Sequence, residues 1–148
     1  MLATLLAAGT GFVRPAIDWH ALAPEIILVI TIAVALLVDV SSPEGSRWTV
    51  SSVAGVGLLA AMIPVLTLAV DGSSRSMFGG AYVVDDFALA LKGLFLVAGY
   101  LTILMSTNTI AEGDYHEGEY YYLLVSSVLG MTFMASARDL ISIFVAPE

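Results

Sequence analysis

The stretch that decides the fold is residues 118–148, GEYYYLLVSSVLGMTFMASARDLISIFVAPE. Its tyrosines, long apolar run and polar Ala-Arg-Asp step are typical of a membrane helix, a tight turn and a second helix that runs back into the bilayer. Glu148 follows Asp139 by nine residues. At about 1.5 Å per residue, its carboxylate would lie roughly 14 Å beyond the turn, near the middle of the hydrocarbon layer. A carboxylate at that depth is costly, so Glu148 is a candidate proton-path residue.

The composition indicates whether the chain lies in water or in a lipid bilayer. Of its 148 residues, 59% are hydrophobic and 12% are charged, and the mean hydropathy is +0.94. A soluble domain would be about half apolar and about a quarter charged, so this chain belongs in a lipid bilayer. Its 5 basic and 13 acidic residues leave no basic surface for nucleic acid. The absence of cysteine excludes disulfides, Cys-ligated zinc and cysteine-held iron–sulfur clusters within the chain.

Four apolar runs are long enough to cross a bilayer, which takes about 20 residues. We therefore predict an all-α, polytopic transmembrane fold that forms one membrane domain over residues 1–148. The helices are expected at about 22–40, 50–70, 83–106 and 119–137, with the start of a fifth at 139–148. Residues 71–80, rich in Gly and Ser, are expected to form a loop. Pro24 suits the first turn of the first helix, and Pro64 is expected to kink the second.

Small residues four positions apart indicate faces where helices pack closely. Ser51 and Gly55 form such a face on the second predicted helix, and Ser126 and Gly130 form one on the fourth. We therefore expect close helix neighbours on both faces.

Charged residues within or at the ends of these helices are the remaining candidates for function. Glu25 and Asp39 stand at the two ends of the first helix, where we interpret them as carboxylates in the headgroup region, the alternative being a proton-path role. Lys92 is the base inside the third helix. It could snorkel toward the end that carries Asp85, pair with an acid on a neighbouring helix, or belong to an ion path. We retain Lys92 as a second proton-path candidate.

Catalytic and metal-ligating patterns are absent from the sequence. His116 lies among acidic residues, but the spacing matches no known ligand pattern, so we interpret residues 106–118 as a solvated acidic loop. No glycine-rich phosphate loop or Ser-His-Asp set is present. We expect no catalytic residue, metal or cofactor site in this chain.

Several stretches resemble one known family. They are AYVVDDFALALK within residues 78–92, GEYYYLL at 118–124, LGMTFMASARDLISIF at 129–144, and APEII at 23–27. From about residue 20 onward, the chain resembles subunit N of the bacterial proton-pumping NADH:quinone oxidoreductase, respiratory complex I.

The resemblance implies an antiporter-like membrane subunit with inverted helix repeats and broken helices, of which this chain would be the amino-terminal fragment. Glu148 falls on the family's glutamate, which pairs with a lysine two helices later as an element of the proton pump. Pro147 departs from the apolar or small residue usual at that position. The resemblance also implies that NADH, flavin, iron–sulfur clusters and quinone bind in other subunits. Other membrane-arm subunits would be the partners, and the location would be the bacterial inner membrane.

Two other functions stay open. The chain could be a subunit of a related cation/proton antiporter assembly, or a small four-helix membrane scaffold or assembly protein with no ion path. A gene that continues past Glu148 into helices with intramembrane lysines would favour the pump. Orientation also stays open, because the positive-inside rule favours a cytoplasmic amino terminus whereas the resemblance implies the outer side.

Overall fold

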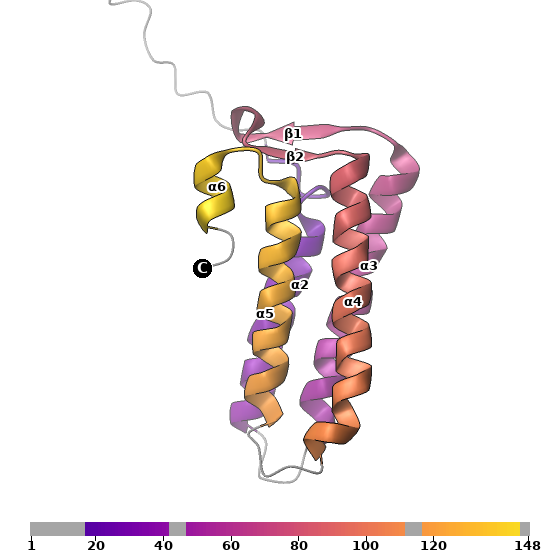
Figure 1. Cartoon of the computed structure of the whole chain (residues 1–148), viewed down its shortest axis with the longest axis vertical. Coiled ribbons are helices and arrows are strands. Elements are labelled where there is room, and N and C mark those ends of the chain that lie inside the picture. Colours follow the sequence, from indigo (N-terminus) through magenta and orange to yellow (C-terminus); the bar gives the residue numbers. More distant parts are fainter. Residues whose placement is uncertain (1–16, 42–46, 112–116, 146–148) are drawn as a thin grey trace, which may run out of the picture.

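The computed structural model describes residues 17–41, 47–111 and 117–145. A bundle of four long helices forms most of it (Figure 1). These are α2 (Ala23–Ser41), α3 (Arg47–Asp71), α4 (Asp86–Ala111) and α5 (Glu117–Ser136), and the short α6 (Leu140–Val145) follows α5. Each helix runs antiparallel to the one before it, so α2 and α4 both begin at the same end of the bundle.

Three of these helices can cross a membrane by length and composition. Within the described ranges they are α2, α3 and α4. α5 is also long, at 20 residues, but it carries Glu117, Glu119 and several hydroxyl side chains. A mostly helical fold with membrane-capable helices is therefore confirmed, although a short hairpin of two strands departs from the all-α prediction. Three of the four predicted complete spans are confirmed.

A β-hairpin closes the end of the bundle where α2 and α4 begin (Figure 1). Its strands are β1 (Arg75–Met77) and β2 (Tyr82–Val84), antiparallel and joined by a helical turn at Phe78–Gly80. Gly79 and Gly80 have φ angles of 69° and 96°, which glycine adopts without strain. The predicted helix start at residue 83 is wrong, because Tyr-Val-Val favours a strand and α4 begins only at Asp86.

Asp85 ends the hairpin and begins α4. Its Oδ1 accepts a hydrogen bond from the Ala88 amide at 2.8 Å, the usual geometry of a helix N-cap. Its Oδ2 pairs with the Arg138 guanidinium, which follows α5. The Arg138 amide in turn donates to the Ala81 carbonyl at 2.8 Å, and Tyr82 forms a β-bridge with Ala137. The hairpin is therefore fastened both to the start of α4 and to the junction between α5 and α6.

Glycines bring neighbouring helices close together. A Cβ added at Gly57 of α3 would lie 2.2 Å from the Thr31 side chain of α2, and one at Gly99 of α4 would lie 2.7 Å from Val128 of α5. Gly55, from the predicted small face of α3, lies beside Tyr100 of α4. These contacts fix the register of α2 against α3 and of α4 against α5, because any larger side chain would push the helices apart.

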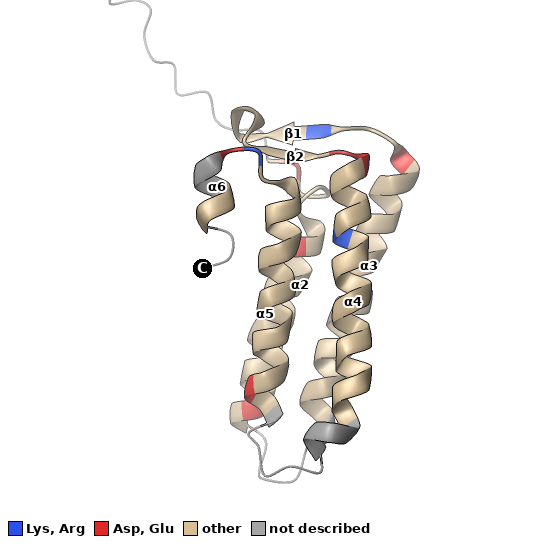
Figure 2. Ribbon diagram, viewed as in Figure 1, with Lys and Arg blue, Asp and Glu red and all other residues tan. Residues whose placement is uncertain are grey.

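The middle of the bundle is apolar inside and outside, and the charged residues gather toward its ends (Figure 2). Leu28, Leu58, Leu96 and Val125 are examples of core residues from the four long helices. Large apolar side chains are also exposed on all of these helices, which suits a surface that faces lipid.

Candidate functional site

A buried ion pair joins α2 and α4 near the hairpin. The Lys92 ammonium nitrogen lies 2.7 Å from Glu25 Oε1, and the side chains are 0% and 7% exposed, respectively. Glu25 is in the first turn of α2, where the positive end of the helix dipole favours a carboxylate. Lys92 lies about two turns into α4, which starts at the same end of the bundle, so the two helices bring these groups together.

Tyr82 is the third member of this site. Its hydroxyl accepts a hydrogen bond from Lys92 Nζ at 2.9 Å, and that nitrogen lies 5.1 Å from the centroid of the tyrosine ring. The ring itself packs against Phe133 of α5, with the centroids 5.4 Å apart. Burial raises the pKa of the Tyr82 hydroxyl, and the nearby Glu25 charge raises it further, so the hydroxyl stays protonated. We call Glu25, Lys92 and Tyr82 the Lys92 cluster.

The Lys92 cluster holds charge where water is scarce. Removing two charges from water is expensive, and their attraction offsets that cost only while both are present. Both carboxylate oxygens of Glu25 are buried, and Oε1 faces Lys92. Each charge of the pair therefore depends on the other.

Glu25 also lines a groove of about 780 Å³ between α2 and α5. Mostly apolar side chains form its walls: Ile26, Val29 and Ile30 of α2, Leu129, Met131, Phe133 and Met134 of α5, and Val145 of α6. The predicted small face of α5, Ser126 and Gly130, lines this groove. Glu25 thus lies between the groove and Lys92.

The structure decides between several of the sequence-based interpretations. Lys92 pairs with an acid on a neighbouring helix, as one of the open interpretations expected, and its ion-path role stays a prediction. Asp85 pairs with Arg138 and caps α4. Glu25 stands in the first turn of α2, as the headgroup interpretation expected, but its side chain is buried inside the bundle against Lys92. Asp39, at the far end of α2, lies against Gly118 of α5.

Other predicted residues fall outside the described ranges. Glu148 and Pro147 are among them, so the proton-path role of Glu148 stays a prediction. His116 is also outside, and the predicted loop 106–118 is too long, because α4 runs to Ala111 and α5 begins at Glu117. In the part of the chain that the structure does describe, no group of His, Asp and Glu side chains could hold a metal ion.

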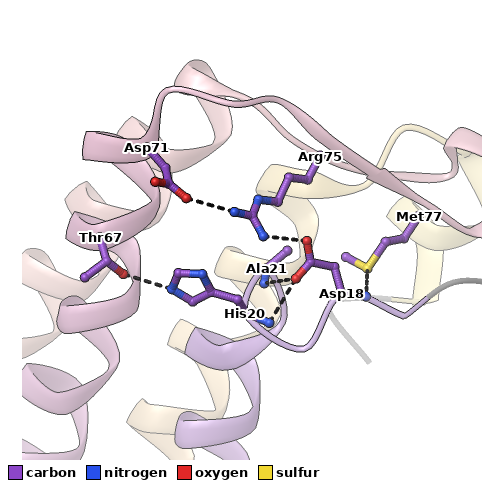
Figure 3. A network of polar contacts seen from close by, with 7 residues as sticks. All are labelled: Asp18, His20, Ala21, Thr67, Asp71, Arg75 and Met77. Atoms are coloured by element: carbon purple, nitrogen blue, oxygen red, sulfur yellow. Dashed lines mark hydrogen bonds and ion pairs between the residues drawn. The ribbon is translucent and has the colours of Figure 1, made fainter.

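A second polar network fastens the segment before α2 to the hairpin (Figure 3). Asp18 accepts a hydrogen bond from Arg75 at 2.6 Å and two more from the His20 and Ala21 amides. Arg75 also reaches Asp71 at 2.9 Å. The hydrogen bond from Arg75 holds the pKa of the Asp18 carboxyl below its usual value, despite some desolvation.

A further contact in this network joins α3 to the same segment, because the His20 ring lies 3.0 Å from the Thr67 hydroxyl. Sequence reasoning missed this network, since its members lie far apart in the chain. It also missed the partner of Lys92, although both Glu25 and Lys92 stand out in the sequence as charges near helix starts.

Comparison with known proteins gives consistent relatives, although no family model matches the chain. It is 37% identical over 135 residues to NADH-quinone oxidoreductase subunit N of Chloroflexus aggregans, a match that covers 90% of this chain and 27% of that protein. NAD(P)H-quinone oxidoreductase subunit 2 of a Synechococcus strain is 30% identical over 95% of this chain and 26% of its own length. Subunit N of Anoxybacillus flavithermus is 34% identical over 88% of this chain and 26% of its own length.

The chain thus spans about a quarter of the length of the curated relatives that it matches. The matches extend over nearly the whole chain, from which the stretches that carry the resemblance also come. The chain belongs to the family of NADH-quinone oxidoreductase subunit N.

Proposed function

We propose that the chain forms part of a membrane-arm subunit that takes part in redox-driven proton translocation by an NADH:quinone oxidoreductase. Its place would be the bacterial cell membrane, and its partners would be other membrane-arm subunits of that complex. The redox groups, namely flavin, iron–sulfur clusters and quinone, would be bound by other subunits. Family membership and the three membrane-capable helices support this proposal.

The buried Lys92–Glu25 pair is the observation that carries the proposal. Ionisable groups inside a membrane protein are expensive, and they typically mark ion pathways and proton relays. Two such groups in contact are coupled, since protonation of one changes the proton affinity of the other. The pair would therefore respond to a charge that moves nearby, which is what a pump driven by distant redox chemistry requires.

Glu148 remains a second proton-path candidate under the same proposal. It would supply a carboxylate on the helix that begins with α6, deeper in the bilayer than the Lys92 cluster. Its role rests on the family resemblance and on its position in the sequence.

A double substitution separates a role in pumping from a role in folding. Glu25→Leu combined with Lys92→Leu removes both charges together, which a fold usually tolerates far better than the loss of one partner. The variant is made in the full-length subunit, and protons translocated per NADH oxidised are measured in membrane vesicles with matched amounts of complex. We expect normal assembly and a loss of at least about half of the proton yield, the scale expected for the loss of a functional intramembrane charge pair.

Asp39→Asn is the matched control, because it removes a carboxylate from the opposite end of the same helix. It should leave the proton yield unchanged. A wild-type yield in the Glu25→Leu/Lys92→Leu variant would mean that the pair is structural and that the proposed proton path does not include it.

A further inference from the structure

We propose that Tyr82 is a positioning residue that holds Lys92 against Glu25 and ties this pair to the α5–α6 junction. The inference rests on the proposed pumping role of the pair. It assigns a function to the β-hairpin, which closes this end of the bundle (Figure 1) and carries Tyr82, a residue that is only 3% exposed.

Tyr82 contacts the pair through its hydroxyl. An ammonium group has three donors, and Lys92 directs one of them to the Tyr82 oxygen at 2.9 Å while Glu25 lies at 2.7 Å. Two acceptors on different elements fix the position of the Lys92 nitrogen better than one, because a long, flexible side chain with a single partner can pivot.

Tyr82 contacts the junction through its ring and its backbone. The ring packs on Phe133 near the end of α5, and the backbone forms a β-bridge with Ala137, the residue after that helix ends. The neighbouring carbonyl of Ala81 accepts a hydrogen bond from the Arg138 amide at 2.8 Å. Tyr82 therefore connects Lys92, through its hydroxyl, to the junction between α5 and α6, through its ring and its backbone.

The hydroxyl acts by position and does not act as a base. Burial raises the pKa of Tyr82, so the phenol keeps its proton at physiological pH. The titratable groups that touch Lys92 are Glu25 from α2 and Tyr82 from β2, as far as the described residues extend. α5 contributes the uncharged Phe133 and Ser136 side chains beside Tyr82, and Asp85 and Arg138 form a separate ion pair.

Tyr82→Phe in the full-length subunit of the assembled complex tests the inference, because it removes the hydroxyl and keeps the ring. We expect normal amounts of complex, and a proton yield per NADH that falls about two- to tenfold, the scale of one ordinary hydrogen bond. The pH profile of that yield should move by about one unit toward lower pH. The Tyr82 hydroxyl accepts a hydrogen bond from the charged Lys92 ammonium, and the charged form loses this stabilisation in the variant. A purely structural tyrosine would change the amount of complex and leave the pH profile in place.

Tyr121→Phe is the matched control. Tyr121 is another buried tyrosine, 1% exposed, that belongs to α5 at the opposite end of the bundle. Its substitution should change neither the yield nor the pH profile. The same measurements on a triple variant, Tyr82→Phe with Glu25→Leu and Lys92→Leu, show whether the tyrosine acts through the pair, since groups that act as a unit are not additive.

The results separate the two proposals. If the Glu25→Leu/Lys92→Leu variant loses proton yield and Tyr82→Phe adds nothing to that loss, the inference is supported. If that double variant loses yield but Tyr82→Phe alone behaves as wild type, the positioning role is overturned and the proposed function stands. A further loss in the triple variant would also overturn it, because Tyr82 would then act independently of Lys92. A double variant with full yield overturns both.

Discussion

Two ion pairs of nearly equal length hold the hairpin end of the molecule, in very different surroundings. Lys92 and Glu25 are 2.7 Å apart with side chains 0% and 7% exposed, whereas Arg75 and Asp18 are 2.6 Å apart with side chains 24% and 33% exposed. An exposed pair contributes about 0–1 kcal/mol to stability, because water and ions screen it. Losing one member of a buried pair costs about 3–5 kcal/mol, because the other charge is left without a partner. Burial, and not distance, therefore separates the proposed proton-path pair from the pair that fastens the hairpin.

The largest expected effect comes from breaking the buried pair on one side only. Lys92→Leu leaves the Glu25 carboxylate buried alone and should destabilise the protein by about 3–5 kcal/mol. Glu25→Leu/Lys92→Leu should cost much less, within about 1 kcal/mol of wild type, because no charge is left unpaired. Thermal unfolding in detergent micelles, followed by helical circular dichroism, measures both. If the single variant melted no lower than the double variant, the two charges would not depend on each other.

An intermediate effect is expected at Asp85, whose carboxylate both caps α4 and pairs with Arg138. Asp85→Ala removes the acceptor for the Ala88 amide as well as the partner of Arg138, and should cost about 0.5–2 kcal/mol. Asp85→Asn keeps an oxygen for the cap and removes the charge, so it should cost about 1 kcal/mol or less. The melting temperatures of the two variants show which half matters. Equal losses in both would mean that the ion pair dominates and that the comparison drawn above needs revision.

The smallest effect is expected at the exposed pair, and it depends on pH and salt. The pKa of the Asp18 carboxyl lies below its usual value of 3.8, so its charged form stabilises the fold at higher pH, and this contribution is lost as the pH falls through the lowered pKa. Arg75→Gln should lower stability only slightly near neutral pH. It should also weaken the loss of stability on acidification, because Arg75 is the main cause of the shift.

The same contribution should shrink between about 0.1 and 1 M salt, where the Debye length falls from about 10 to 3 Å. Melting temperatures of wild type and Arg75→Gln across pH and salt measure it. A difference in melting temperature between the two proteins that changed with neither pH nor salt would contradict a screened, exposed ion pair.

The helices were predictable because apolar runs of sufficient length have few other uses. The first predicted span, 22–40, became α2, Ala23–Ser41, and the fourth, 119–137, became α5, Glu117–Ser136. The same near-uniform apolarity explains what could not be predicted. When almost every residue of a helix is apolar, periodicity does not reveal which face meets which neighbour, so the partner of Lys92 stayed open among the acids of the chain.

The hairpin escaped prediction for a different reason. Its strands have only three residues each, too few for an alternating pattern to stand out from the apolar residues that begin α4. The hairpin forms because Gly79 and Gly80 allow the turn and because Tyr82 and Arg138 hold it on the bundle. Those are long-range contacts, and a local reading of the sequence contains no information about them.

Glu25 is synthesised before the lysine that neutralises it exists. α2 leaves the ribosome first, and Lys92 follows only after all of α3 and the hairpin. Insertion scales assign a free-energy cost of about 2.5–3.5 kcal/mol to a lone acidic group at the centre of a membrane helix. Glu25 avoids part of that cost, because it lies in the first turn of α2 and therefore near the interface. The buried pair therefore forms late, when α4 enters the membrane beside α2. Insertion of α4 is then the step that fixes the final depth of α2.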